Sequence, residues 1–234
     1  MNQMSSPSPA FDRITDWIFD LDNTLYPREC NLFAQIDTLI TQYVMEVARL
    51  DFAAARDLQK LYYRDHGTTL NGLMKSHKVD PEHYLQTVHA IDYGPVNAHP
   101  ELVQSIALLP GRKFIFTNGS VSHAEAVLAR LGAQDLFEGI FDIKAAKYQP
   151  KPLEVAYAGF LDAHGVDPGR AIMFDDLEKN LRVPHEIGMT TVQVVAGPDY
   201  AHEQCDVWEL GRAEGETHVH YVTDNIADFL VRCR

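Results

Sequence analysis

Three short apolar segments that each end at polar, oxygen-bearing side chains constrain the fold of this chain more than any other feature of its sequence. The segments are residues 17–19, 113–116 and 171–174, and the polar groups after them are Asp20 with Asp22, Thr117-Asn118 and Asp175-Asp176. Helical patterns separate the segments, and this alternation is typical of a parallel sheet with helices on its faces. Because the carboxyl ends of parallel strands share one edge, where ligands bind, we expect these polar groups to lie together.

A long helical stretch interrupts this alternation directly after the first acidic segment. Apolar residues recur there at three- and four-residue spacing, which indicates amphipathic helices. The expected helices cover residues 32–50, 52–66, 69–78 and 81–90. The segment 91–100 contains a glycine and two prolines, so it predicts a linker back to the sheet.

The rest of the chain predicts further strands and helices in alternation. The helices are expected at residues 101–109, 122–131, 152–164 and 180–187, and the strands at 139–143 and 191–195. Pro184 fits a first helical turn, and Thr223 or Asp224 is expected to cap a closing helix. The segment 196–217 gives no prediction of structure or role.

These patterns define a fold class and a division into domains. We expect an α/β fold with a doubly wound, mostly parallel, Rossmann-like sheet in three layers and an inserted all-helical cap domain. The core is expected at residues 13–25 and 98–234, the cap at 26–97, and a disordered tail at 1–12.

The composition restricts the partners and the compartment. The net charge of -13 argues against binding to nucleic acid polymers or anionic membranes, because those surfaces attract positively charged faces. Cys30, Cys205 and Cys233 form no close pair, which favours reduced thiols and a cytoplasmic location. No apolar segment has the length of a membrane helix, and the sequence leaves the oligomeric state open.

Four carboxylates gathered at one sheet edge require positive charge. Two such charges about 4 Å apart repel each other by about 4 kcal/mol at an effective dielectric constant near 20. Oxygen ligands without a histidine or cysteine cluster favour Mg²⁺, so we expect a magnesium site. Taken singly, each motif also has a plain structural explanation as a turn or a helix cap, and only their joint occurrence favours a site.

The same groups suit the transfer of a phosphoryl group. A carboxylate can attack phosphorus to form an aspartyl-phosphate, and a second carboxyl group can protonate the leaving oxygen and later accept a proton from water. A metal ion, a hydroxyl group, backbone amides and a lysine would supply positioning and charge. A small phosphate ester is therefore the expected partner.

The motifs resemble those of the haloacid dehalogenase-like hydrolase superfamily. They are FDLDNT at 19–24, FTN at 116–118, KP at 151–152 and FDDLEKN at 174–180, in that family's order. The resemblance implies that Asp20 is the nucleophile and a metal ligand, and that Asp22 is the general acid/base and binds Mg²⁺ through its carbonyl. It also implies phosphate contacts from Thr117, Asn118 and Lys151, metal contacts from Asp175 and Asp176, and support from Thr24 and Asn180.

Longer segments are similar to the pyrimidine 5′-nucleotidase branch of that superfamily. The similarity lies in DNTLYP, in the run from HAIDY through PELVQSIALLPGRKFIFTNGSVSHAEAVLARLG, and in YQPKP, and it implies Mg²⁺-dependent release of phosphate from UMP or CMP. Asp22 argues for phosphoryl transfer, since haloacid dehalogenases lack an acid there. A sugar-phosphate phosphatase or phosphomutase and a catalytically idle binding protein remain the alternatives.

Residues at the entry to the cap are the expected determinants of specificity. They are Tyr26, Arg28, Asn31 and Phe33. The histidines, among them His66, His77, His89, His99 and His123, are scattered along the chain and are expected on the surface or at helix caps.

Overall fold

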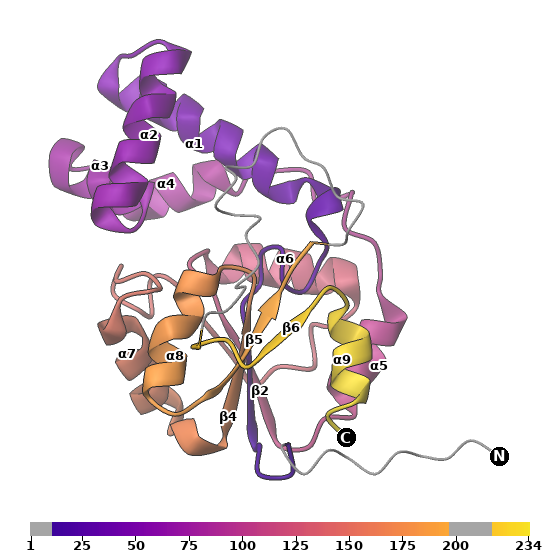
Figure 1. Cartoon of the computed structure of the whole chain (residues 1–234). Helices are drawn as coiled ribbons and strands as arrows, with labels where there is room; N and C mark the ends of the chain where they lie inside the picture. Colours follow the sequence, from indigo (N-terminus) through magenta and orange to yellow (C-terminus); the bar gives the residue numbers. More distant parts are fainter. Residues whose placement is uncertain (1–10, 197–216) are drawn as a thin grey trace.

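The computed structural model describes residues 11–196 and 217–234, and the described strands form one six-stranded parallel sheet (Figure 1). The strands are β1 (Asp16–Phe19), β2 (Arg112–Phe116), β3 (Gly139–Phe141), β4 (Ala171–Asp175), β5 (Thr190–Val194) and β6 (Tyr221–Thr223). Their order is β3-β2-β1-β4-β5-β6, so the chain winds outward in both directions from β1. The sheet is doubly wound, which confirms the predicted fold class.

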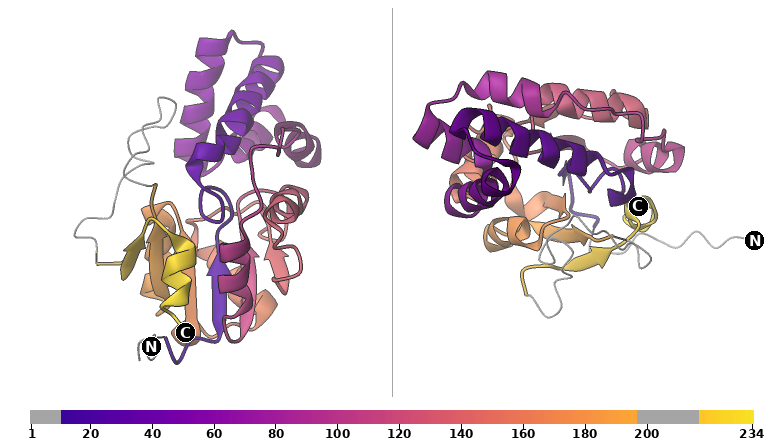
Figure 2. Two further views of the ribbon diagram at one scale, coloured as in Figure 1. Left: turned by 90° about the vertical axis from the view of Figure 1, so that its right-hand side faces the viewer. Right: turned by 90° about the horizontal axis from the view of Figure 1, so that it is seen from above.

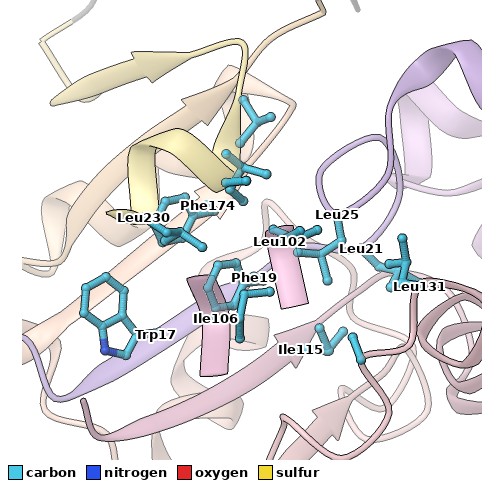
Figure 3. Close-up of a cluster of buried hydrophobic side chains, with 14 of the residues drawn as sticks. Trp17, Phe19, Leu21, Leu25, Leu102, Ile106, Ile115, Leu131, Phe174 and Leu230 are labelled. Carbon is cyan, nitrogen blue, oxygen red and sulfur yellow. The ribbon is translucent and has the colours of Figure 1, made fainter. Parts of the chain in front are cut away.

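Helices cover both faces of the sheet, because alternate residues of a strand point to opposite sides. The helices of the core are α5 (Pro100–Ala107), α6 (Val121–Leu131), α7 (Glu154–His164), α8 (Arg182–Glu186) and α9 (Ile226–Val231). On β1, Trp17 and Phe19 belong to the cluster shared with α5, α6 and α9, part of which Figure 3 shows. Ile18 belongs to the opposite cluster, with side chains of α7 and α8. The three predicted layers are therefore present.

Four helices form a separate unit between β1 and α5, after the short 3₁₀ helix η1 (Arg28–Cys30). They are α1 (Leu32–Ala48), α2 (Phe52–His66), α3 (Thr69–His77) and α4 (Pro81–Val88). This unit has its own apolar core, which includes Val44, Leu73 and Leu85. It lies over the edge of the sheet at which β1 ends (Figures 1 and 2), as expected of a cap.

Two predicted helix starts differ from the structure. Helix α7 begins at Glu154, not at Pro152, because the backbone N–H of Leu153 closes a turn on the carbonyl of Pro150 (2.9 Å). Helix α9 is capped by Asn225, whose side chain accepts from the N–H of Asp228 (3.1 Å), and not by Thr223 or Asp224.

Other predictions concern the segment near Pro184 and the ends of the described ranges. The segment 180–187 divides into the 3₁₀ helix η3 (Glu178–Leu181) and α8, and Pro184 lies in the first turn of α8 as predicted. Phe11 packs against the rings of Tyr221 and Phe229, so the predicted tail stops before it. The rest of that tail, residues 1–10, and residues 197–216 with Cys205 lie outside the described residues.

The remaining short element is the 3₁₀ helix η2 (Pro168–Arg170), which leads into β4. Among the helices of the described ranges, none combines the length and the apolar character needed to cross a membrane.

Candidate active site

The carboxyl ends of β1 and β4 bring three buried acids together. The N–H of Asp20 donates to the carbonyl of Phe174 (2.8 Å), which extends the pairing of the two strands to their last residues. Carboxylate oxygens of Asp20, Asp175 and Asp176 all lie within 4.8 Å of one another. This cluster lies where the winding of the sheet reverses, the usual position of a ligand site in such folds.

Two basic side chains offset part of this negative charge. Lys151 Nζ lies 2.7 Å from Asp20 Oδ1 and 2.6 Å from Asp175 Oδ2, and its side chain is 1% exposed. Arg28 Nη2 donates to Asp176 Oδ2 at 2.5 Å. Lys151 comes from the turn before α7, and Arg28 comes from η1 at the entry to the cap, so the site is assembled from distant segments.

The acids remain short of positive charge despite these partners. Burial raises the pKa of Asp20 to about 7, a shift that Lys151 opposes and that Asp175 and Asp22 reinforce. Burial, together with the charges of Asp175 and Asp20, also raises the pKa of Asp176 well above its usual range, although Arg28 and Lys151 lower it. Further positive charge at this cluster would therefore be stabilising.

The acids fit a divalent cation such as Mg²⁺. The ion binds oxygen ligands at about 2.1 Å, so ligands on opposite sides lie about 4 Å apart, close to the spacing of these carboxylates. Asp175 Oδ1 is oriented by the side-chain amide of Asn180 (2.9 Å) and the N–H of Leu177 (3.0 Å). Asp20, Asp175 and Asp176 are the residues that would hold the metal.

Asp22 lies apart from this cluster and has different partners. Its Oδ1 accepts from Tyr26 Oη at 2.5 Å and lies 2.8 Å from His123 Nε2. Burial would raise the pKa of Asp22, but the charge and hydrogen bond of His123, the hydrogen bond of Tyr26 and the charge of His89 lower it to about 2. The structure therefore separates the two acids of the first motif into different environments.

The residues expected to contact phosphate line the same edge. Thr117 is buried, and its Oγ1 accepts from the N–H of Gly119 (2.9 Å) in the loop after β2. The side chain of Asn118 holds the backbone of Lys151 from both sides: Nδ2 donates to the Lys151 carbonyl (3.2 Å), and Oδ1 accepts from its N–H (2.8 Å). Thr24 Oγ1 donates to Asp20 Oδ2 (3.2 Å). Asn118 thus also positions the lysine, a contact that the motif does not predict.

One histidine at the site, His123, contradicts the expectation of a surface or capping position, whereas His89 is the C-cap residue of α4. His123 is fully buried beside Asp22, and the ring of His89 stacks on it with 4.5 Å between centroids. His99 does cap a helix, since its Nδ1 accepts from the N–H of Leu102 (3.2 Å). The sequence position of His123 could have indicated its place at the site. His123 lies in the first turn of the helix after TNGS, and that helix begins at the edge where the acids gather.

The four candidate specificity residues separate into two pairs. Tyr26 and Arg28 are buried and reach the acids, as described above. Asn31 lines a pocket of about 560 Å³ between α1 and the return linker, and none of the acids lines that pocket. Phe33 is 39% exposed. Only Tyr26 and Arg28 therefore contact the candidate site.

Comparison with known proteins gives a family match and a distant curated relative. A family model described as haloacid dehalogenase-like hydrolase matches residues 18–186. Phosphate metabolism protein 8 of Saccharomyces cerevisiae (strain ATCC 204508 / S288c) is 26% identical over 209 residues, which cover 80% of this chain and 63% of that protein. The chain thus spans less than two thirds of the length of this relative.

Solved structures share the fold at low sequence identity. The L-2-haloacid dehalogenase of Xanthobacter autotrophicus with chloropropionic acid covalently bound has a TM-score of 0.57 and 18% identity, covering 93% of this chain and 97% of that chain. The hydrolase YfnB of Bacillus subtilis bound to magnesium has a TM-score of 0.56 and 15% identity, covering 95% and 100%. Because the family model spans most of the chain and includes both motifs that deliver the clustered acids, this protein belongs to the haloacid dehalogenase-like hydrolases.

Proposed function

We propose that this hydrolase is a Mg²⁺-dependent phosphomonoesterase that acts on a small phosphate ester through an aspartyl-phosphate on Asp20. The observation that carries the proposal is the placement of Asp20. Its carboxylate is fixed by Lys151 at one oxygen and by Thr24 at the other, beside two further acids. An oriented carboxylate next to a cation is suited to attack phosphorus.

The second acid of the motif supplies the proton transfers. Asp20 forms a bond to phosphorus as the bond to the ester oxygen breaks. Asp22, which a pKa of about 2 leaves ionised in the free protein, takes up a proton from solvent as the anionic ester binds and gives that proton to the ester oxygen. Asp22 then accepts a proton from the water that hydrolyses the aspartyl-phosphate, which restores both residues. A bound Mg²⁺ would neutralise charge on the phosphoryl oxygens. Thr117, Asn118 and Lys151 would hold those oxygens.

Within this class, a pyrimidine nucleoside 5′-monophosphate is the proposed substrate. The support is the resemblance of DNTLYP, the FTNGS region and YQPKP to pyrimidine 5′-nucleotidases. The acidic net charge agrees with a small substrate in place of a nucleic acid polymer.

A panel of phosphate esters tests both the proposed reaction and the proposed substrate. Phosphate release from UMP, CMP and several hexose phosphates is measured with Mg²⁺ and with a chelator. We expect release that requires Mg²⁺ and is fastest for UMP or CMP. Faster release from the hexose phosphates would reject the nucleotide assignment, and no Mg²⁺-dependent release from any ester would reject the phosphatase itself.

Replacement of the nucleophile is the sharpest single variant. Asp20→Asn keeps the size of the side chain but removes the attacking carboxylate, so we expect phosphate release to fall by at least about 10⁴-fold. Circular dichroism should show an unchanged fold. Near-full turnover in a folded Asp20→Asn variant would contradict the assignment of Asp20.

A further inference from the structure

The two oxygens of Asp22 have different surroundings. Both hydrogen bonds to the carboxylate, from Tyr26 and from His123, reach Oδ1. Within residues 11–196 and 217–234, no hydrogen bond reaches Oδ2. A Cβ added at Gly119 would lie 3.8 Å from Asp22 Oδ2 and 3.3 Å from Thr117 Oγ1, so Oδ2 is on the side of the proposed phosphate loop. One oxygen is therefore held by two hydrogen bonds, and the other by none among the described residues.

His123 is fixed by contacts on several sides. Its side chain is fully buried, and its backbone N–H donates to Ser120 Oγ (3.3 Å) in the first turn of α6. Ring atom Nε2 lies 2.8 Å from Asp22 Oδ1, and Nδ1 lies 3.0 Å from Tyr93 Oη. The ring also stacks on His89 with an interplanar angle of 11°. Rotation of the imidazole would break both hydrogen bonds, so the ring has one favourable orientation.

Two residues that contact this ring, His89 at the C-cap of α4 and Tyr93, lie where the chain returns from the cap. Tyr93 Oη also donates to the carbonyl of His89 (3.1 Å), and His89 Nδ1 lies 3.0 Å from Ser120 Oγ. Tyr26, the other partner of Asp22, belongs to the linker that leads into the cap. One connection between the core and the helical unit therefore contacts Asp22 Oδ1 directly through Tyr26, and the other reaches it through His123.

We propose that His123 is the positioning residue of the acid/base Asp22. It holds Oδ1, together with Tyr26, so that Oδ2 is directed at the oxygen of the leaving group, and Tyr93 and His89 hold His123 in turn. This proposal rests on the proposed phosphatase function, because it assigns Asp22 to proton transfer. It predicts a loss that depends on the leaving group, whereas a purely structural histidine would affect all substrates alike.

Two esters with different leaving groups distinguish these cases. The parameter kcat/KM covers the steps up to departure of the leaving group, so hydrolysis of the aspartyl-phosphate does not contribute to it. An alkyl phosphate such as UMP needs a proton on its leaving oxygen, whereas p-nitrophenyl phosphate needs little help. We expect His123→Leu to lower kcat/KM by about 10²-fold or more for the alkyl ester and by less than about 10-fold for the aryl ester.

A conservative variant and a matched control accompany this measurement. His123→Gln retains an amide donor near the place of Nε2, so it should recover a substantial part of the activity on the alkyl ester. His164→Gln is the control, because the ring of His164 is tilted against that of Phe114 (4.7 Å between centroids) and the His164 carbonyl accepts from Arg112 at the start of β2, away from the acids. It should leave the ratio of the two kcat/KM values unchanged.

The outcomes separate the two proposals. Equal losses on both esters, or no loss on the alkyl ester, would overturn the positioning role and leave the phosphatase assignment intact. Failure of the wild-type protein to hydrolyse either ester would overturn the phosphatase and the positioning role together. If His123→Leu does not fold, Tyr93→Phe is measured in its place, because it removes only the hydroxyl group beside Nδ1. A loss of about 3- to 10-fold in kcat/KM that is confined to the alkyl ester supports the positioning role. An equal loss on both esters, or no loss, overturns it.

Discussion

Lys151 shows how a single residue makes the acidic site compatible with folding. Burial alone would lower the pKa of this lysine, but the charges of Asp175 and Asp20 and the hydrogen bonds to them raise it. Its Nζ also lies 5.3 Å from the centroid of the Phe116 ring, a cation–π contact. The ammonium group is therefore the fixed positive centre of the site.

Removal of that charge should cost both stability and activity. In Lys151→Met, Asp20 and Asp175 stay buried without their cation, so we expect a loss of about 3–5 kcal/mol in the free energy of unfolding, measured with urea in the absence of divalent ions. Phosphate release should fall below detection. Lys144→Met is the control, because Lys144 pairs with Glu82 near the surface and should contribute no more than about 1 kcal/mol. Similar losses in both variants would contradict this account.

The two linkers connect the cap to Asp22 and His123 at the candidate site. Besides the contacts of Tyr26 and Tyr93, the side chain of Gln35 on α1 clasps the backbone of Asp92, donating to its carbonyl and accepting from its N–H at 3.0 Å each. The outgoing and returning chains are thus bonded to each other as well as to the site. A substitution in either linker is therefore expected to alter the position of the Asp22 carboxylate.

The return linker should also make stability depend on pH. Burial and the charge of His123 lower the pKa of His89 to about 3, although Asp22 acts in the opposite direction. An unfolded histidine titrates near 6.5, so the unfolded chain takes up a proton as the pH falls below about 6.5, and the folded chain does not do so until about pH 3. The contribution of His89 to stability is therefore present above pH 6.5 and is lost as the pH falls through this window.

Unfolding of a neutral variant measures this contribution. We expect His89→Gln to lose stability less steeply than the wild type between pH 6.5 and 5, by up to about 1.4 kcal/mol per pH unit in urea titrations. His77→Gln controls for the loss of a histidine, since His77 is exposed on α3. Parallel pH curves for His89→Gln and the wild type would exclude the buried neutral imidazole.

At the scale of the whole molecule, an ion pair joins the entry of the cap to the acidic edge of the sheet. Arg28 enters from the cap side and pairs with Asp176, which would also be a metal ligand. Further contacts join cap and core away from the acids: Lys179 Nζ donates to Tyr63 Oη on α2 (2.7 Å), and Asn71 Nδ2 on α3 donates to the carbonyl of Tyr148 (2.9 Å). The position of the cap and the charge at the metal site are therefore physically connected.

This connection predicts competition between Arg28 and the divalent ion. In Arg28→Met, Asp176 loses a cationic partner, so we expect Mg²⁺ to bind about 3- to 10-fold more tightly, measured by isothermal titration calorimetry. Asp176→Asn should instead weaken Mg²⁺ binding strongly, because it removes a charged ligand. Weaker Mg²⁺ binding in Arg28→Met would show that the arginine supports the metal site.

Local sequence patterns were sufficient to predict the fold and the place where the acids of the site gather. Apolar strands that end in acids, helical periodicity and the order of the motifs predicted the doubly wound sheet, the helical insertion and the gathering of Asp20, Asp175 and Asp176. They worked because the period of a strand or helix and the shared edge of a parallel sheet follow from the covalent chain and its local hydrogen bonds.

The partners of those acids depended on contacts between distant segments. Asp22 and His123 are 101 positions apart, and Arg28 and Asp176 are 148 positions apart. No periodicity specifies which ring or guanidinium group arrives beside a given carboxylate, because that depends on how helices and linkers pack. For this reason the sequence analysis misplaced His123, and it did not separate Asn31 and Phe33 from Tyr26 and Arg28. The sequence by itself determined where the acids gather, and only the tertiary structure decided which side chains orient and neutralise them.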